Sequence, residues 1–184
     1  MSLTPSNMLP LDTVAPSFEL PNPITNNNLK LQNCKGEKGT VIMFICNHCP
    51  FVKYVNSELV AIANKYLQKG MSFIAINSND INNYPEDSPS EMINTANDNN
   101  YPFPYLFDET QEVAKAYNAA CTPDLYLFDD QLKLVYRGQL DDSRPGNNIP
   151  ISGIDLRQAI EHLINNKAQK TLQKPSIGCN IKWK

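Results

Sequence analysis

Two cysteines separated by two residues, Cys46 and Cys49, are the side chains of this sequence best suited to chemistry. They follow an apolar run and precede an amphipathic stretch, which predicts that they lie where a buried strand meets a helix. Thiols three positions apart at a helix start can reach each other and form a disulfide. The free N–H groups and the dipole of a helix N-terminus favour an anion there, so the pKa of Cys46 is expected to fall below the ~8.5 of a free cysteine.

Thiol–disulfide exchange is the chemistry that this pair favours. The thiolate is the attacking form in such exchange, so Cys46 is predicted to be the nucleophile. Cys49, expected one turn inside the helix and less exposed, is predicted to be the resolving thiol. His48 directly precedes it. A protonated His48 near Cys46 would favour the thiolate and make the disulfide more oxidising.

Metal binding is the alternative that the residue types leave open. Half of a zinc site is one form of it, because zinc usually takes four close ligands and three further cysteines occur in the chain: Cys34, Cys121 and Cys179. A non-enzymatic module that holds Cu(I) or Zn(II) through soft ligands is the other form. Its ligands would be Cys46 and Cys49 together with Cys121 or His48. Ordinary buried cysteines are the third interpretation of the pair.

The elements that must position the pair are visible in the hydrophobic pattern. Residues 40–45 and 71–76 are continuous apolar runs, typical of strands covered on both faces. Between them, apolar residues from Val52 to Tyr66 recur every three or four positions, which predicts a helix that Gly70 ends. Strand, helix and strand in this order predict a βαβ unit with a parallel strand pair.

The remaining segments predict one α/β domain over residues 1–184 with a mixed sheet flanked by helices. Residues 1–17 are expected to be irregular, and residues 78–90 to form a polar loop. The C-terminal tail, 167–184, is expected to pack on the domain because Ile177, Ile181 and Trp183 need a surface. The expected elements are an edge strand at 18–20, a turn at 22–28, helices at 88–99, 112–118 and 156–164, a small strand at 105–107, and a hairpin of 125–128 with 132–136.

Composition excludes several classes of function. The 184 residues carry a net charge of -3 with no stripe of Lys and Arg, so nucleic-acid binding is not expected. No apolar run approaches the ~18–20 residues of a membrane span. The N-terminus shows no signal peptide, and with five cysteines, an odd number, the expected location is cytoplasmic. No glycine-rich phosphate loop is present, so no cofactor is predicted.

Several motifs together resemble the AhpC/TSA-type redoxins of the thioredoxin-like superfamily. The segment 14–21 (VAPSFELP) is similar to the entry motif of that branch, and 39–50 to the strand that leads into its active-site turn. Residues 121–125 (CTPDL) resemble the segment that carries the superfamily's cis-proline, and Gly138 also fits. The likeness covers about residues 10–165. More narrowly, CNHCPFVK and the tail PSIGCNIKWK resemble a bacterial subgroup of peroxiredoxin-like thioredoxin-family proteins.

The resemblance implies a thioredoxin-like fold with an N-terminal redoxin-type extension, and it implies roles for individual residues. Cys46 and Cys49 match the redox dithiol. Pro123 matches the cis-proline, whose loop lies against the dithiol and offers backbone groups to a substrate. Thr122 precedes it, as is common in the superfamily. Cys121 and Cys179 are candidates for auxiliary roles, whereas Cys34 has none.

Departures from the family pattern leave a second activity open. Thioredoxin has Trp where Ile45 stands and a buried acid where Thr40 stands. The His before Cys49 resembles that of the disulfide oxidase DsbA. In a peroxiredoxin-like alternative, Cys49 would be the peroxidatic cysteine and Cys46 would stand where the family has Thr. Arg137 is then the nearest candidate for the family's arginine, although its position does not match.

The sequence thus predicts a thiol–disulfide oxidoreductase of cell redox homeostasis. Its expected substrate is a disulfide-containing protein or a small thiol, and its electron donor is not identified. Peroxidase activity and the metal-binding module are the alternatives.

Overall fold

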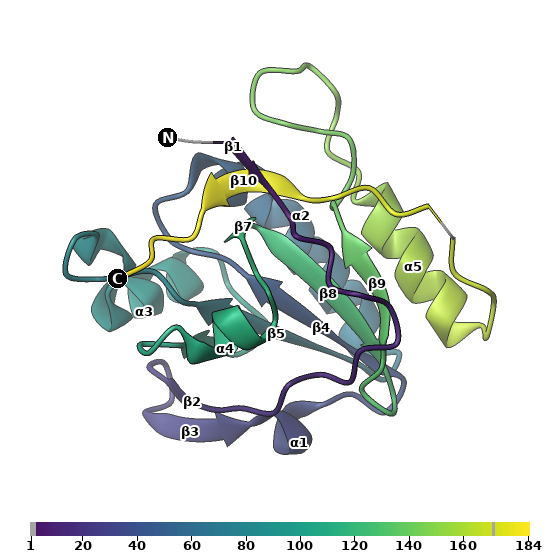
Figure 1. Ribbon diagram of the computed structural model, residues 1–184, viewed down its shortest axis with the longest axis horizontal. Coiled ribbons are helices and arrows are strands. Elements are labelled where there is room, and N and C mark those ends of the chain that lie inside the picture. The colour runs from purple at the N-terminus through teal and green to yellow at the C-terminus, as the bar shows by residue number, and fades with distance from the viewer. Residues whose placement is uncertain (1–2, 171) are drawn as a thin grey trace.

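A five-stranded mixed sheet forms the centre of the computed structural model, which describes residues 3–170 and 172–184 (Figure 1). The strand order is β6-β5-β4-β8-β9. Strand β4 pairs in parallel with β5, and β5 in parallel with β6, whereas β8 is antiparallel to both β4 and β9. The strands are β4 (Gly39–Phe44), β5 (Met71–Asn77), β6 (Tyr105–Phe107), β8 (Asp124–Asp129) and β9 (Leu134–Gly138).

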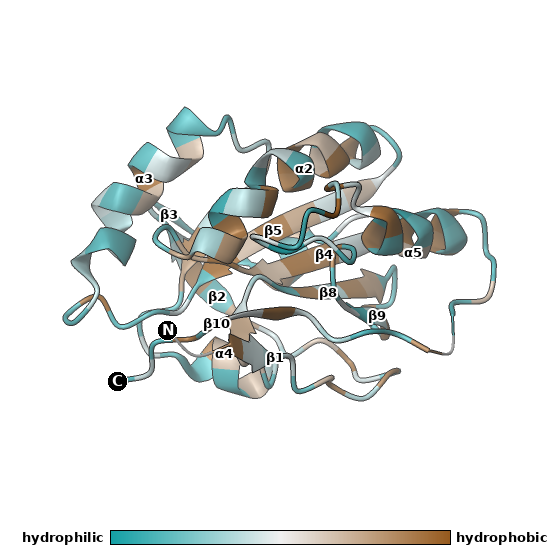
Figure 2. Cartoon of the chain, turned by 90° about the horizontal axis from the view of Figure 1, so that it is seen from above, coloured by the Kyte–Doolittle hydropathy of each residue, from teal (hydrophilic) through white to brown (hydrophobic). Residues whose placement is uncertain are grey.

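Helices and a small hairpin cover the two faces of this sheet. Figure 2 shows α2, α3 and α5 over one face and α4 beneath the other, with the brown, hydrophobic strands between them. The elements of the first face are α2 (Pro50–Leu67), α3 (Pro89–Asp98) and α5 (Ile154–Ile164). Those of the second face are β2 (Glu19–Asn22), β3 (Asn27–Lys30), α1 (Leu31–Cys34) and α4 (Glu112–Ala116). The α/β fold and the parallel β4–β5 pair confirm the prediction from the hydrophobic pattern.

Strand β4 shows why this sequence forms a central strand. All six of its residues are buried. Val41 and Met43 pack in the apolar cluster beneath α2 and α5, while Ile42 and Phe44 pack in the cluster on the opposite face. Successive side chains of a strand point to opposite faces, so a continuous apolar run is what a sheet covered on both sides requires.

A second, three-stranded sheet carries the C-terminal segment. Strand β10 (Ile177–Asn180) lies between β1 (Leu3–Pro5) and β7 (Cys121–Thr122) and is antiparallel to both. The strand β1 falls where an irregular segment was expected. Of the three apolar tail residues, Ile181 is buried, whereas Ile177 and Trp183 stay 37% and 41% exposed. The tail is therefore held mainly by backbone pairing rather than by those two side chains.

Element boundaries differ from the predictions at a few places. The turn expected over 22–28 is shorter, because β3 begins at Asn27. Cys34 ends the short helix α1, for which no element was expected. Between β5 and α3, η1 (Pro85–Asp87) adds a 3-10 turn to the segment expected to be a polar loop. No helix within 3–170 or 172–184 combines the length and hydropathy of a membrane span.

Candidate active site

The cysteine turn joins the end of β4 to the start of α2. The helix begins at Pro50, and Cys49 is its N-cap, so Cys49 occupies the helix end that the sequence assigned to Cys46. The expectation that Cys49 lies one turn inside the helix was wrong. Proline has a fixed φ and no N–H, which suits the first helical position, so the Cys-Pro step sets the start of the helix after Cys49.

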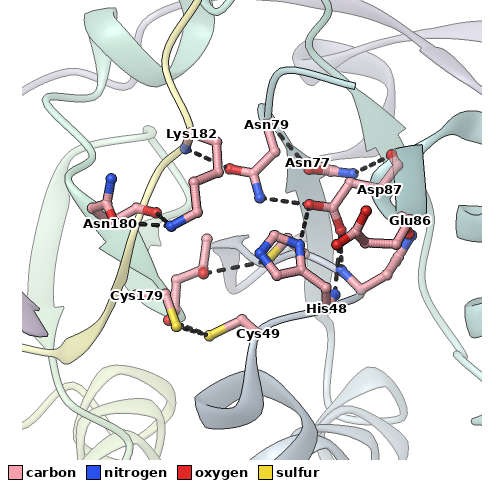
Figure 3. A network of polar contacts seen from close by, with 12 residues as sticks. His48, Cys49, Asn77, Asn79, Glu86, Asp87, Cys179, Asn180 and Lys182 are labelled. Atoms are coloured by element: carbon pink, nitrogen blue, oxygen red, sulfur yellow. Dashed lines mark hydrogen bonds and ion pairs between the residues drawn. The ribbon is translucent and has the colours of Figure 1, made fainter. Parts of the chain in front are cut away.

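Cys49 is completely buried. Its sulfur contacts the carbonyl group at the end of β7 and the sulfur of a third cysteine. Its Sγ lies 3.2 Å from the backbone O of Thr122 and 2.9 Å from the Sγ of Cys179 (Figure 3). A hydrogen bond from the Cys46 thiol is the main cause that lowers the pKa of Cys49 to about 5, with a further contribution from Cys179, although burial opposes this. Cys49 is therefore the sulfur that carries the charge in the reduced pair.

Cys46 lies three residues before the N-cap and borders a cavity. It is 2% exposed, and its Sγ lies 3.4 Å from the Thr122 hydroxyl. The hydrogen bond that it gives Cys49 raises its pKa, as does burial. The predicted low pKa of Cys46 was thus wrong, because Cys49 has taken the helix N-terminus. Cys46 nevertheless lines a cavity of about 400 Å³ between α2 and α3, together with His48 and Tyr101.

His48 forms an ion pair with a buried aspartate. Its Nδ1 lies 2.6 Å from Oδ2 of Asp87, a residue with no exposed surface (Figure 3). The hydrogen bond that His48 donates to Asp87 raises the pKa of His48, against the opposing effect of burial. The His48 ring also stacks on Tyr84, with ring centroids 5.4 Å apart. His48 is therefore held in one orientation and favours its protonated form.

Asp87 accepts four hydrogen bonds, two on each carboxylate oxygen. Oδ1 accepts the backbone N–H groups of Asn47 and His48, at 2.7 and 3.3 Å. Oδ2 accepts Nδ1 of His48 and Nδ2 of Asn79, the latter at 2.7 Å. Burial alone would raise the pKa of Asp87, but the hydrogen bonds from His48 and Asn79 outweigh it and lower the pKa. The carboxylate thus clamps the cysteine turn from the segment after β5.

The loop between β7 and β8 closes the other side of the turn. The Thr122–Pro123 peptide bond is cis, which confirms the prediction made for Pro123. Thr122 contacts both sulfurs, through its hydroxyl to Cys46 and its carbonyl to Cys49. Pro123 itself lines a smaller cavity, of about 20 Å³, with Phe51 among its walls. The turn is therefore held between Asp87 on one side and Thr122 on the other.

Comparison with known proteins identifies the family of this arrangement. The model of the AhpC/TSA family matches residues 11–137. The chain belongs to the AhpC/TSA family. The redoxin resemblance inferred from the sequence motifs is thereby confirmed.

Two solved structures are similar to this chain over nearly its whole length. An uncharacterized conserved protein from Geobacillus kaustophilus is 60% identical, with a TM-score of 0.98, and the match covers 100% of this chain and 97% of that one. A hypothetical protein from Sinorhizobium meliloti 1021 is 44% identical, with a TM-score of 0.96 and 98% of each chain covered.

A more distant structure supports the thioredoxin-like fold. The thioredoxin domain of a thiol-disulfide oxidoreductase from Bacteroides vulgatus is 18% identical, with a TM-score of 0.67 over 85% of this chain and 99% of that one. At this identity the likeness shows the fold alone. No curated protein gave a significant match. The thioredoxin-like α/β fold predicted from the sequence is confirmed.

The extra cysteines of this AhpC/TSA protein differ in their relation to the pair. Cys179 contacts Cys49 directly. Cys121 is buried beside them, and its thiol points to the backbone O of Pro123 at 3.7 Å, while burial raises its pKa. Cys34 is half-buried on α1, and its thiol donates to the backbone O of Lys30. The structure therefore brings one auxiliary candidate, Cys179, into sulfur contact with the pair.

A metal site would have different ligands from those expected. Within the described residues, the donor atoms that gather are those of Cys46, His48 and Asp87, all within 4.8 Å of one another. Both oxygens of Asp87 already accept hydrogen bonds from four N–H groups. Binding a cation there would require Asp87 to give up the bond from His48. The hydrogen-bonded form suits a proton site better than a cation site.

Arg137 does not take part in the site. Its Nε donates to the backbone O of Leu9 at 2.7 Å, and its Nη1 to Oε1 of Gln173 at 2.7 Å. Both partners belong to segments that flank β9. The arginine considered for a peroxidase site is therefore engaged in holding the N- and C-terminal segments to the sheet.

Asp87 and Asn79 are the site residues that sequence reasoning missed. Both fall in the segment expected to be a polar loop. The Asp87 side chain reaches the cysteine turn across the sheet edge, and Asn79 donates to Asp87. Asn79 also accepts the backbone N–H of Lys182 at 2.8 Å, which ties the C-terminal tail to this network (Figure 3). The available signal was positional: polar groups that follow a buried parallel strand lie at the same edge as the turn after β4.

Proposed function

We propose that this AhpC/TSA-family protein is a thiol–disulfide oxidoreductase that uses Cys46 and Cys49 as its redox dithiol. The observation that carries the proposal is that Thr122 contacts both cysteine sulfurs while Cys46 lies on the wall of the cavity. Of the two, Cys46 is the one that a substrate disulfide in the cavity meets, because Cys49 has no exposed surface. Cys46 is therefore the nucleophile, and Cys49 the resolving thiol.

In the proposed cycle the proton of the pair moves before sulfur attacks. In the reduced protein the Cys46 thiol donates to the Cys49 thiolate. Transfer of that proton to Cys49 leaves the Cys46 thiolate, which the nearby His48 imidazolium favours by its charge. Cys46 then attacks one sulfur of the substrate disulfide, and the other sulfur leaves as a thiolate. Cys49 loses its proton to that group and attacks Cys46, and the second substrate sulfur leaves as a thiolate.

Thr122 and Asp87 act as positioning residues in this cycle. The Thr122 hydroxyl lowers the pKa of Cys46, although the hydrogen bond to Cys49 and burial exceed this effect. Asp87 orients the His48 ring and holds the backbone of the turn. Thr122 acts directly on the two sulfurs that it contacts, whereas Asp87 acts through His48 and the backbone of the turn.

Insulin reduction driven by dithiothreitol tests the proposal. Replacing Cys46 with Ser is expected to abolish the exchange, because Cys49 alone does not reach the cavity. Replacing Cys49 with Ser is expected to trap a mixed disulfide on Cys46, seen as an added mass. The matched control is Cys34→Ser, since Cys34 lies on α1 in the other apolar cluster. Full insulin reduction by the Cys46→Ser variant would refute the assignment.

Peroxide reduction by Cys49 is the second candidate, and one observation favours it. Cys49 stands at the helix N-terminus with its pKa lowered to about 5, the state that a peroxidatic thiolate needs. Its complete burial and the engagement of Arg137 elsewhere count against it. Peroxide consumption that survives Cys46→Ser and is lost in Cys49→Ser would favour this candidate over the dithiol cycle.

A further inference from the structure

Cys49 is the middle of a row of three sulfurs. On the cavity side it accepts a hydrogen bond from Cys46, and on the interior side its Sγ lies 2.9 Å from that of Cys179. Figure 3 shows the side chains of Cys49 and Cys179 pointing at each other, one from the turn before α2 and the other from β10. All three cysteines are buried, with at most 2% of each exposed. A resolving thiol in the dithiol cycle needs one partner, whereas Cys49 has two.

The contact with Cys179 is built into the fold by the position of β10. Cys179 pairs with Thr122 on one side and with Leu3 on the other. The preceding residue, Gly178, approaches so closely that a Cβ there would lie 2.0 Å from the backbone O of Thr122. Only glycine permits this approach, which brings the strand against the loop that contacts both active-site sulfurs.

Backbone hydrogen bonds fasten the segment after Cys179 on the same side. The N–H of Ile181 donates to the backbone O of Ala120 at 3.1 Å. The N–H of Asp80 donates to the backbone O of Lys182 at 2.8 Å, and Lys182 in turn donates to Asn79. Cys179 thus sits on a segment held at both ends, and its sulfur has little freedom to leave Cys49.

We propose that Cys179 is a third redox-active cysteine, which receives the disulfide from Cys46–Cys49 and stores it as Cys49–Cys179. This step rests on the proposed function and follows it. The Cys179 thiolate attacks the sulfur of Cys49, the Cys46–Cys49 bond breaks, and Cys46 leaves as a thiolate. The proton that Cys179 gave up goes to Cys46. The chain keeps the same two-electron oxidation, so no further oxidant is required.

Electrostatics favour the transfer once the first disulfide has formed. In the reduced protein, burial and then the hydrogen bond and charge of Cys49 raise the pKa of Cys179 to about 12. When Cys49 enters a disulfide it loses its charge, and these two contributions disappear. The ammonium group of Lys182 acts in the opposite direction and favours a thiolate at Cys179. The Cys179 thiol, which contacts Cys49 in the reduced protein, thus ionises more easily once Cys49 is in a disulfide, and its thiolate can then attack Cys49.

The transfer would separate reaction with the substrate, at Cys46, from storage of the disulfide, at Cys49 and Cys179. Cys46 returns to the cavity wall as a free thiol, while the oxidation lies in an interior bond that a substrate in the cavity does not contact. Cys121 is not a competing acceptor, because its thiol points to the Pro123 carbonyl. Cys34 belongs to the apolar cluster on the opposite face of the sheet. The structure therefore singles out Cys179 among the three cysteines outside the pair.

Peptide mapping of the full chain tests the transfer, and the sequence makes the two disulfides easy to tell apart. Trypsin cuts after Lys38 and Lys53, so Cys46 and Cys49 share the peptide 39–53. Cys179 falls in 171–182, because the Lys174–Pro175 bond resists cleavage. A Cys46–Cys49 disulfide therefore stays within one peptide, whereas a Cys49–Cys179 disulfide links two peptides.

The protein is oxidised in a buffer of reduced and oxidised glutathione, quenched in acid at successive times, unfolded, alkylated and digested. The expected result is an internal disulfide in 39–53 first, followed by a linked pair of 39–53 with 171–182 in which Cys46 carries the alkyl group. Cys34→Ser is expected to behave as the natural sequence does. Cys179→Ala is expected to lose the linked pair and to keep the internal disulfide.

Failure of the transfer and failure of the dithiol cycle give different maps. An internal Cys46–Cys49 disulfide with Cys179 fully alkylated at every time would overturn the transfer and leave the proposed function standing. Absence of the internal disulfide in both the natural sequence and Cys179→Ala would overturn the proposed function. The map of the natural sequence alone decides whether the transfer occurs, so that decision does not depend on the stability of a variant.

Discussion

Asp87 and Asp124 are two aspartates with no exposed surface, and their carboxyl groups are in opposite situations. Asp87, in η1, accepts four hydrogen bonds, and its pKa is lowered. Asp124, in β8, pairs with Phe44 of β4, two residues before Cys46. Its Oδ2 accepts from Tyr126 and the N–H of Ala120, while its Oδ1 has no hydrogen-bond partner among the described residues. Burial raises its pKa to about 6.

The difference shows that burial raises the pKa of a carboxyl group at this site unless its partners outweigh it: His48 and Asn79 do so for Asp87, whereas the neutral donors around Asp124 do not. Both residues lose their water, which disfavours the anion. Two backbone N–H groups and two side-chain donors compensate Asp87, which stays ionised and keeps His48 protonated. The donors around Asp124, among them Ser6 and Tyr126, do not outweigh its burial, so Asp124 takes up a proton as the pH falls towards 6. One carboxylate thus positions the cysteine turn, and the other is a site where protons bind.

The largest expected effect follows from removing the carboxylate of Asp87, which accepts four hydrogen bonds. Asp87→Ala leaves the donors of Asn47, His48 and Asn79 buried without an acceptor, and each such group costs about 1–3 kcal/mol. We expect the free energy of unfolding at pH 7 to fall by about 3 kcal/mol or more. Urea unfolding followed by circular dichroism measures it.

A surface aspartate provides the control for this substitution. Asp130 is exposed in the turn between β8 and β9, and Asp130→Ala is expected to change stability by less than about 0.5 kcal/mol. Equal losses for the two variants would show that the four hydrogen bonds of Asp87 contribute nothing net.

A smaller effect is expected at Asp124, whose contribution to stability increases as the pH falls. The folded pKa of about 6 lies above the ordinary 3.8, so between these values the folded protein binds the proton and the unfolded chain does not. Stability contributed by Asp124 therefore rises as the pH falls from 6 to 4, by up to about 1.4 kcal/mol per pH unit. Urea unfolding of the natural sequence and of Asp124→Asn at several pH values measures it as a difference, in which other titrating groups cancel. A difference that is flat with pH would contradict the elevated pKa.

Part of this fold and site could be predicted from the sequence. The β4–α2–β5 unit, the hairpin of β8 with β9 and the cis-proline were predictable, because each depends on a local pattern or a recognisable motif. The start of α2 at Pro50 was readable too, since proline favours the first helical position. Pro50 therefore marks the helix start and places the N-cap at Cys49, not at Cys46.

Asp87 and the Cys49–Cys179 contact depend on pairing that no local pattern encodes. Asp87 reaches the turn from 40 residues away in sequence, and Cys179 reaches Cys49 across 130. Strand β10 holds that contact through two short partners, β1 and β7, whose sequences show no alternation long enough to predict a strand. Contacts of this range are set by the tertiary fold, and the sequence offers only the residue types.

The smallest expected effect is on the titration of His48. Its pKa is raised by the hydrogen bond that it donates to Asp87, so Asp87→Asn, which keeps the shape and removes the charge, is expected to move the midpoint down towards the ordinary 6.5. Above its midpoint the imidazolium charge that favours the Cys46 thiolate is lost, and in the variant this loss begins at lower pH. Proton NMR of the imidazole signals measures the midpoint, with the second histidine of the chain, His162, as internal reference. Asp124→Asn is the matched control, because its side chain makes no hydrogen bond to His48; a downward shift of the same size in both variants would mean that general charge, and not the Asp87 clamp, sets the protonation of His48.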